Sequence, residues 1–486
     1  MAKYSHDVVI LGGGAGGLTA AVGCAQLGMK TALIDKERLG GDCLHFGCVP
    51  SKSLLMSASV YHSMNDAERY GLPSVSPPPV DLGAVNARIA SVIAEIEKHD
   101  SPERFRALGA DVFLGHAEFR SPHEIDLDGE QRISAPNIIL ATGSSPRSIP
   151  LEGLQEAGYI TNLDAFSLPR LPRRIATIGG GPIGVELSQA YRRLGAQVTI
   201  IDKASHVLPR EDADMASVVQ DRLVDEGIAL RLGAQIVRVQ KDGSVKKVHL
   251  TTASGAEETL EVDEILLAVG RQGNTADLRL DQAGVDVEKS YAVVDEKLRT
   301  SQRHILAIGD VNGRYQFTHV AGAEGSVAVR RIALHAGGSM NYQSVPWCTY
   351  TDPELASVGY NEATARAADV DYDVIIQPFG STDRAQAEGE TAGQMKILLD
   401  RKGRVIGTQI AGRHAGELLG PSLFAVSKRW KIGSIMSPVY PYPTLSELHK
   451  KAVSTHMAPR LFNDRIRGIL RLLFRYRGTA GSASAT

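Results

Sequence analysis

The chain has 486 residues, of which 43% are hydrophobic and 22% are charged, values typical of an ordinary soluble globular protein. Its formal net charge of −2 gives no general attraction to nucleic acid or to an anionic membrane, and no apolar run is long enough to span a bilayer. At about 150 residues per domain, this length predicts roughly three domains.

The N-terminal segment MAKYSHDVVIL leads directly into a strand-like run, without the apolar core and cleavage site of a signal peptide. We therefore expect a cytoplasmic protein. Structural disulfides are rare in that compartment, so a close pair of cysteines is there more often catalytic or metal-binding.

The first pattern is a strand, a glycine turn, a helix and a second strand over residues 7–35. Gly12, Gly14 and Gly17 have GxGxxG spacing, and an alanine-rich helical stretch follows them. These glycines permit a tight turn, close approach of the backbone to a pyrophosphate and close helix–sheet packing, while Asp35 is placed to accept hydrogen bonds from a ribose. A lone GxGxxG could be a surface turn, but in this setting it predicts a dinucleotide-binding unit.

Residues 40–52 read GGDCLHFGCVPSK and place two of the four cysteines, Cys43 and Cys48, five positions apart. A regular helix rises about 7.5 Å over five residues, so a disulfide between them requires distorted backbone, which Gly47 permits. Pro50 suits the first turn of a helix through residues 51–59. The N-terminus of that helix would stabilise a thiolate.

Three interpretations of this pair are open: a metal half-site, a structural staple and a working redox pair. Zinc needs two more ligands, and Cys24 and Cys348 have no suitable spacing, so we expect no metal site. Inert packing does not explain the clustered glycines. The redox pair is favoured.

The dinucleotide pattern returns over residues 174–202, with Gly179, Gly181, Gly184 and Asp202. The first glycine and the acid are 23 positions apart in both copies. The repeat predicts two nucleotide-binding βαβ units and two cofactors. An acid at the end of the second strand favours NAD over NADP, although the lysine that follows it weakens this preference.

Three strand-to-turn segments lie between and after these units, at residues 137–150, 264–275 and 304–313. In the third, Asp310 is placed to hold a hydroxylated cofactor chain. Any one segment could be a surface turn, but together they predict a first domain that is interrupted by the second. The expected domains cover residues 1–150 with 276–345, residues 151–275 and residues 346–486.

GGDCLHFGCVPSK resembles the active-site signature of the class I pyridine nucleotide–disulfide oxidoreductases, such as dihydrolipoamide dehydrogenase, glutathione reductase and mercuric reductase. The likeness extends through ATGSSP, AVGR, AIGD, VPWCTYTDPELASVGY and YPYPTLSE. It implies an α/β fold with two Rossmann-like domains, the first discontinuous, and an α+β C-terminal dimerisation domain. It also implies FAD in the first domain, NAD(H) rather than NADP(H) in the second, and a homodimer.

The resemblance also implies roles for single residues. Electrons would pass from the nicotinamide through flavin to the disulfide, with Cys43 as the thiol that meets the substrate and Cys48 as the thiolate against the flavin. Lys52 and Glu186 match the family pair near the flavin and nicotinamide rings, although either could be an ordinary surface charge. The remaining cofactor-binding residues that it implies, beside Lys52 and the glycines and acids above, are Thr142, Gly143, Asp310, His319 and Gly270.

The sequence departs from the family near the C-terminus. Disulfide reductases of this family have a histidine paired with glutamate, which moves the substrate proton across the dimer interface. Here Glu447 is kept and Tyr442 replaces the histidine. A phenol titrates near ~10, so it is a poor base at neutral pH but a good hydrogen-bond donor. Nearby His449 is off the matching position and is expected to be an exposed helical histidine.

The tyrosine at this position resembles the pattern of mercuric reductase. However, this chain ends in GTAGSASAT and has no vicinal cysteine pair of the kind that delivers mercury in that enzyme. We therefore expect neither efficient mercury reduction nor fast dihydrolipoamide oxidation.

The last stretch, residues 459–477, combines an apolar stripe with six arginines. Such a pattern is expected to pack on the protein's own surface or on a dimer partner; a helix lying on an anionic membrane is the less favoured alternative. The stripe consists of Phe462, Ile466, Ile469, Leu470 and Leu473.

The sequence thus predicts a cytoplasmic FAD-dependent enzyme that passes electrons from NADH through Cys43 and Cys48 to a small-molecule or protein-borne disulfide, a metal ion or another small acceptor. The alternatives are dihydrolipoamide dehydrogenase proper, a mercuric reductase without the terminal cysteines, an NADH:quinone-type reductase, and a non-catalytic flavin-bound subunit. No nucleic-acid partner is expected.

Overall fold

The computed structural model describes residues 4–478, which fold into two compact units. The first unit runs to Val345 and includes Thr349–Thr351, and the second comprises Pro346–Cys348 and the chain from Asp352 onward. Residues 479–486, which hold all but the first residue of the terminal GTAGSASAT, lie outside the described residues, so the structure does not address the expectation about that terminus.

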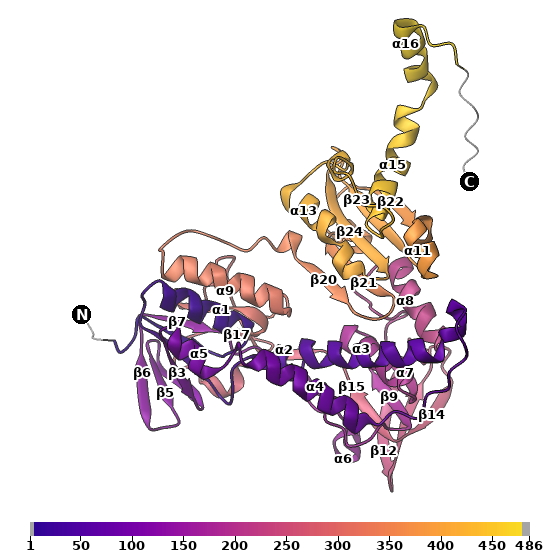
Figure 1. The fold of residues 1–486 in the computed structure, drawn as a ribbon. Helices are drawn as coiled ribbons and strands as arrows, with labels where there is room; N and C mark the ends of the chain where they lie inside the picture. The colour runs from indigo at the N-terminus through magenta and orange to yellow at the C-terminus, as the bar shows by residue number, and fades with distance from the viewer. Residues whose placement is uncertain (1–3, 479–486) are drawn as a thin grey trace. The chain divides into compact units, whose positions relative to one another are not determined.

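A parallel sheet with the strand order β19-β7-β1-β2-β3 forms the centre of the first glycine-rich half of the first unit (Figure 1). Its inner strands are almost entirely buried, which explains why they read as continuous apolar runs. β19 follows the second glycine-rich unit in sequence but pairs with β7, so the first domain is discontinuous, as predicted. The strands are β1 (Val8–Leu11), β2 (Thr31–Asp35), β3 (Ala110–Leu114), β7 (Asn137–Leu140) and β19 (Ile305–Ala307).

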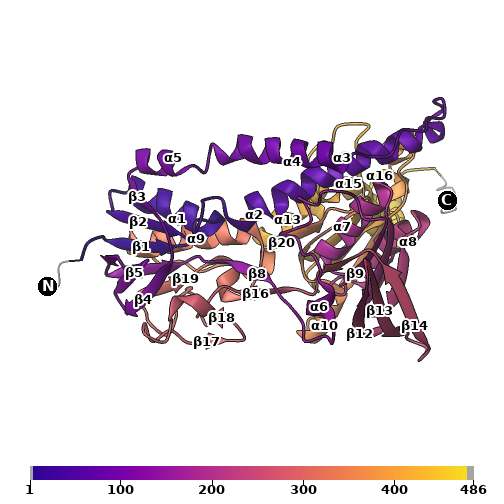
Figure 2. The ribbon, with the colours of Figure 1, turned by 90° about the horizontal axis from the view of Figure 1, so that it is seen from below.

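Two helices, α1 (Ala15–Gln26) and α9 (Thr318–Ile332), lie side by side along this sheet (Figures 1 and 2). A glycine sets their close approach, because a Cβ on Gly23 would lie 2.6 Å from Val329 Cγ2. The late part of the sequence therefore supplies both a strand and a covering helix to the first domain.

The second glycine-rich half contains a parallel sheet with the order β11-β10-β9-β15, in which β9, α7 and β10 repeat the arrangement of β1, α1 and β2. The chain between β11 and β15 forms a separate antiparallel sheet with the order β12-β13-β14. The elements are β9 (Arg174–Ile178), α7 (Pro182–Arg193), β10 (Gln197–Asp202), α8 (Ala213–Asp225), β11 (Ala229–Leu232), β12 (Gln235–Asp242), β13 (Val245–Thr251), β14 (Glu257–Val262) and β15 (Glu264–Leu267).

Two long helices, α3 (Cys48–Asn65) and α4 (Leu82–Glu97), run side by side (Figure 2). The predicted helix through residues 51–59 is confirmed and extends further at both ends. α3 also contacts α7, so the helix that begins at the second cysteine connects the two glycine-rich halves. The other elements here are α2 (Gly41–His45), η1 (Ala67–Tyr70), α5 (Pro102–Ala107), β4 (Ala117–Ser121), β5 (Glu124–Leu127), β6 (Gln131–Ser134) and α6 (Leu154–Ala157).

The predicted strand-to-turn segments at 137–150 and 264–275 pair with each other, through the antiparallel strands β8 (Ser144–Pro146) and β16 (Arg271–Gly273). The segment that leaves the first domain and the segment that returns to it therefore form one two-stranded antiparallel sheet. The short elements that follow are η2 (Ala276–Leu278), β17 (Val287–Glu288), β18 (Tyr291–Ala292), η3 (Gly309–Asn312) and η4 (Tyr342–Ser344).

The second unit is an α+β domain built on a sheet with the order β20-β21-β24-β23-β22, against which α13 and α15 pack. Its elements are β20 (Pro346–Thr349), β21 (Glu354–Gly359), α10 (Glu362–Ala367), β22 (Asp373–Pro378), η5 (Phe379–Ser381), α11 (Asp383–Glu388), β23 (Gln394–Leu399), β24 (Val405–Gly412), α12 (Ala415–Leu418), α13 (Gly420–Lys428), α14 (Gly433–Met436), α15 (Glu447–Leu461) and α16 (Asp464–Phe474).

The expectation that His449 is exposed was wrong. Its side chain is fully buried in α15, together with those of Leu448, Ala452 and Val453. Its Nε2 lies 3.4 Å from Ser422 Oγ, and burial lowers the pKa of the imidazole to about 4. His449 is therefore a neutral core residue at physiological pH.

The C-terminal stripe does not pack on the surface of its own protomer within residues 4–478; packing on a dimer partner, the other half of that expectation, stays a prediction. Within the described chain, α16 has no buried residue, and Leu473 is 65% exposed. Figure 1 shows α16 projecting from the sheet of the second unit. No helix among residues 4–478 combines the length and the apolar content that crossing a membrane requires.

Candidate active site

The two glycine turns have nearly the same geometry. A Cβ on Gly17 would lie 1.8 Å from Gly12 O, and one on Gly184 would lie 1.9 Å from Gly179 O. Gly12 and Gly179 have φ angles of +110° and +111°, in the region that favours glycine. The fingerprint spacing therefore corresponds in both copies to a turn that tolerates no side chain at its first and third glycines.

Asp35 and Asp202 stabilise these turns through hydrogen bonds to the backbone. Asp35 Oδ2 accepts a hydrogen bond of 2.6 Å from Gly13 N, and Asp202 Oδ2 accepts one of 2.6 Å from Gly180 N. Each carboxylate oxygen has a second lone pair, so both acids can still accept from a ribose.

The start of the helix after each turn fits a phosphate group. α1 and α7 begin after Gly14 and Gly181, and neither helix has a side-chain cap or an acidic residue in its described first turn. A Cβ on Gly181 would meet no atom of residues 4–478 within 4 Å, so within this part of the chain the turn opens onto free space. Uncapped N–H groups and the helix dipole favour an anion, so both turns fit the pyrophosphate of a dinucleotide.

The two cysteines flank a break between helices. Cys43 lies in α2, and Cys48 is the first residue of α3. Gly47 between them is tightly enclosed, because a Cβ there would lie 3.0 Å from Asp42 O. The predicted distortion of this stretch is thus a change of helix, which brings two free thiols into hydrogen-bond contact.

The site holds one thiolate and one thiol. The hydrogen bond from Cys43 is the largest effect on Cys48 and helps to lower the pKa of Cys48 to about 6. Thr318 and the charge of Lys52 act in the same direction, whereas burial and Asp42 oppose it. The hydrogen bond to Cys48, followed by burial, raises the pKa of Cys43 far above its usual range. The shared proton therefore stays on Cys43.

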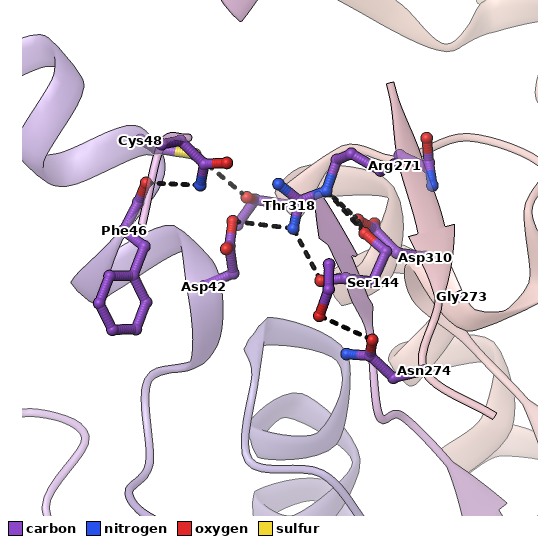
Figure 3. Close-up of polar contacts among 12 residues, drawn as sticks. Asp42, Phe46, Cys48, Ser144, Arg271, Gly273, Asn274, Asp310 and Thr318 are labelled. Atoms are coloured by element: carbon purple, nitrogen blue, oxygen red, sulfur yellow. Dashed lines mark hydrogen bonds and ion pairs between the residues drawn. The ribbon is translucent and has the colours of Figure 1, made fainter. Parts of the chain in front are cut away.

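Thr318 was not found from the sequence. Its Oγ1 lies 3.4 Å from Cys48 Sγ at the first turn of α9, a helix with no side-chain cap at its N-terminus (Figure 3). The start of α9 adds its positive dipole end to that of α3, and both favour a Cys48 thiolate. The contact joins positions 270 residues apart, so no local signal predicted it.

Lys52 and Glu186 form an ion pair, with 2.8 Å between Lys52 Nζ and Glu186 Oε2. Glu186 Oε1 accepts a hydrogen bond of 2.8 Å from Tyr350 N, and the Tyr350 ring lies 4.4 Å from Lys52 Nζ. Tyr350 therefore holds both members of the pair, through its amide and through a cation–π contact. The sequence predicted the pair but not the tyrosine.

A polar network lies beside the cysteines (Figure 3). Arg271 pairs with Asp42 at 3.2 Å and lies 3.8 Å from Asp310, and its Nε donates to Ser144 Oγ. Ser144 Oγ in turn donates to Asp310 Oδ2 at 2.6 Å, and burial raises the pKa of Asp310. The predicted cofactor residue Asp310 is thus connected through Arg271 to the carboxylate next to Cys43.

The other predicted cofactor residues lie on the same unit. Thr142 Oγ1 donates to Asn274 O, and His319, in the first turn of α9, stacks on Phe317 with 5.4 Å between ring centroids. Gly143 and Gly270 have positive φ angles, and a Cβ on either would meet no atom of the described chain within 4 Å. Both glycines therefore leave the strand ends open.

Tyr442 and Glu447 both lie in the second unit. Among the described residues, no hydrogen bond joins their side chains. Tyr442 is 70% exposed, and its hydroxyl donates to Asp383 Oδ2 at 2.9 Å, which raises the pKa of the phenol. Glu447 Oε2 is buried and has no hydrogen-bond partner among residues 4–478. The carboxylate that the sequence predicts as the partner of a base thus has no hydrogen bond to Tyr442 within the described part of the chain.

Comparisons with known proteins agree with this geometry. Residues 6–325 match the family described as pyridine nucleotide–disulphide oxidoreductase, and residues 345–453 match its dimerisation domain, which supports a homodimer. The dihydrolipoyl dehydrogenase of Rhizobium etli is 32% identical over 92% of this chain and 97% of its own length. The mercuric reductase of Bacillus cereus is 31% identical over 93% of this chain and 72% of its own length.

Two solved structures share the fold. The HOCl-induced flavoprotein disulfide reductase RclA of Escherichia coli, solved as a Cu(II) complex, covers 94% of this chain with all of its own length, at 28% identity and a TM-score of 0.82. LpdA of Mycobacterium tuberculosis covers 93% with 99% of its own length, at 29% identity and a TM-score of 0.84. The chain therefore belongs to the pyridine nucleotide–disulphide oxidoreductase family, as a flavin-dependent enzyme that uses FAD and NAD(P).

Proposed function

We propose that the protein carries electrons from NADH to a small acceptor that reacts at Cys43, and that it is not a dedicated dihydrolipoamide dehydrogenase. The split of the cysteine pair into a Cys48 thiolate and a protonated Cys43 carries the first part of this proposal. Tyr442, whose hydroxyl donates to Asp383 and whose pKa is raised, supports the second part, because it cannot act as a base at neutral pH. FAD, when bound, supplies the two-electron transfer between the nicotinamide and the sulfurs. The glycine turn before α1 and Asp310 are the residues proposed to hold it.

A disulfide acceptor would react in two balanced steps. Cys48 takes the proton of Cys43 along their hydrogen bond, and the Cys43 sulfur attacks the acceptor disulfide and expels one sulfur as a thiolate. The Cys48 thiolate, after returning that proton to the leaving sulfur, attacks Cys43, which releases the second acceptor sulfur as a thiolate that takes a proton from water. The acceptor gains two electrons, and Cys43 and Cys48 become a disulfide.

Lys52 and Glu186 are proposed as the link between the cofactor halves. Lys52 lies one helical turn beyond Cys48 on α3, and Glu186 lies on α7 behind the second glycine turn. Their ion pair fixes the position of α3 relative to the nicotinamide-binding half, and Tyr350 restricts the ammonium group to one place. Asp202 supports the preference for NADH, because a carboxylate at this position repels a 2′-phosphate.

The acceptor class is inferred from the relatives. RclA is a flavoprotein disulfide reductase that was solved with Cu(II), and relatives include a mercuric reductase. We propose a disulfide or a thiol-reactive metal ion as the acceptor, reduced by a homodimer in the cytoplasm, where a dithiol is kept reduced.

The test compares two variants of the FAD-loaded protein, Cys48→Ser and Cys43→Ser. Rapid mixing with NADH should give a long-wavelength thiolate–flavin band in the wild type, no band in Cys48→Ser, and a band without any added reductant in Cys43→Ser. Turnover with disulfides and metal ions should be lost in both, and NADH should give a higher kcat/KM than NADPH. Wild-type turnover in both variants would contradict the proposal and favour direct transfer to a quinone-type acceptor.

A further inference from the structure

The C-terminal helix α16 presents an unpartnered apolar face. Ile466, Ile469, Leu470 and Leu473 follow the i, i+3, i+4, i+7 spacing that places them in one stripe. Ile469 is 52% exposed and Leu473 65%. Leu472 and Phe474, at the two edges of the stripe, are 82% and 59% exposed. Large apolar side chains on neighbouring turns are thus turned away from the protomer to which they belong.

The charge of this segment differs from that of the rest of the chain. Residues 460–477 contain six arginines and one aspartate, although the whole chain has a net charge of −2. At 100° per residue, Arg465 and Arg467 lie on opposite flanks of the apolar stripe, and Arg471 lies across the helix from it. Arginines at these flanks can extend their stems along an apolar surface and place their guanidinium groups in a layer of headgroups.

Helix α16 has its own start and is set apart from α15. Asn463 caps it, with Oδ1 accepting from Ile466 N at 2.9 Å, and the preceding Phe462 is 70% exposed. The cap therefore starts α16 as a helix separate from α15, and the binding of its apolar face to a surface would supply the remaining stabilisation that so short a helix needs.

We propose that α16 docks in the plane of a membrane surface rich in anionic phospholipid, with its apolar stripe among the acyl chains and its flanking arginines, Arg465 and Arg467, against the phosphates. Charge complementarity identifies this partner. Packing of α16 against the same helix of a second copy would bring three arginines against three. The helix also lies beyond residues 345–453, the part that matches the family's dimerisation domain.

The probe is the FAD-loaded full-length protein mixed with vesicles of phosphatidylcholine alone or with one-third phosphatidylglycerol. Binding is measured by co-sedimentation at low and high salt. Wild type should bind the anionic vesicles and lose most of this binding at high salt. Arg465→Gln with Arg467→Gln, at the two flanks of the stripe, should weaken binding about 25-fold, since each arginine near such a surface contributes about fivefold. Ile469→Gln with Leu473→Gln should weaken it at least about tenfold.

Leu72→Gln is the matched control, because Leu72 is 60% exposed and lies in the first unit, away from α16 in the sequence. It should leave binding unchanged, and all variants should retain FAD and NADH turnover. Light scattering should show the same dimer for wild type and for Ile469→Gln with Leu473→Gln. A wild type that ignores anionic vesicles would overturn the proposal. So would dissociation of the dimer in that double variant, which would assign α16 to the second copy.

Discussion

At the scale of single residues, the cysteine site depends on how two opposite charges act on one thiolate. Lys52 lowers the pKa of Cys48 and Asp42 raises it, while Arg271 partly neutralises Asp42 at 3.2 Å. The acid that the motif places just before Cys43 therefore limits how strongly the helix ends and Lys52 stabilise the Cys48 thiolate.

This balance predicts opposite shifts in two variants. In the reduced protein the Cys48 thiolate is present above a pH of about 6 and is protonated below it. Lys52→Met should move this transition to higher pH, towards about 7, because a favourable charge is lost, and Asp42→Asn should move it to lower pH. The measurement is the ultraviolet absorbance of the thiolate against pH. Lys98→Met, at the exposed lysine that follows α4, is the control that should change nothing. Shifts of the same sign in Lys52→Met and Asp42→Asn would contradict the assignment.

Tyr442 sets a second expectation at this scale. Its phenol has a raised pKa and is bonded to Asp383, so it cannot serve as a base at neutral pH. Wild type should therefore oxidise dihydrolipoamide slowly. Tyr442→His, with Glu447 available to orient the imidazole, should raise that rate by up to ~10²–10⁴-fold, with a pH dependence near ~6.5.

Steady-state assays with dihydrolipoamide and NAD, across pH, measure this gain. Tyr442→Phe is the control, since it removes the hydroxyl without supplying a base and should gain nothing. A wild type that is already as fast as a dedicated dehydrogenase, or an FAD-loaded Tyr442→His protein without any gain, would argue against this role.

At the scale of elements, the two glycine turns make a matched pair of tests. An alanine at Gly17 or at Gly184 would place Cβ within 2 Å of a carbonyl oxygen, so each should cost about 1–3 kcal/mol or more and lower the Tm. Gly17→Ala should shed FAD, whereas Gly184→Ala should keep FAD but lose reduction by NADH. Flavin absorbance after gel filtration and rapid mixing with NADH separate the two effects. Gly433→Ala, at an open helical position, is the control; loss of FAD from Gly184→Ala would reverse the two cofactor assignments.

The elements also show what the sequence can predict. Glycine turns, apolar strands and the helix after Pro50 were predicted because their causes are local. Thr318, Tyr350 and Arg271 were missed because each reaches the site from a distant segment. The error on His449 had a local signal, since Leu448, Ala452 and Val453 form a helical stripe that includes this histidine.

At the scale of the whole molecule, the discontinuous first domain sets the smallest piece that can hold FAD. Residues 1–150 lack β19 and α9, and with α9 they lack Thr318 beside Cys48. A chain truncated after residue 150 should therefore not retain FAD. A chain truncated after Val345 should retain it but remain monomeric, because the dimerisation match begins at residue 345. Flavin content and light scattering test both statements, and a flavin-loaded 1–150 fragment would contradict the first.

The late position of β19 also bears on how the protein is made. At about 5–20 residues per second, a ribosome takes roughly 10–30 seconds to pass from β7 to β19. During that time the edge of β7 has apolar side chains and unpaired backbone groups, which can pair with other nascent chains. A pause or a bound chaperone in this interval would protect the growing chain from aggregation. The yield of active enzyme should therefore depend on translation speed between residues 140 and 305 more than on speed after them.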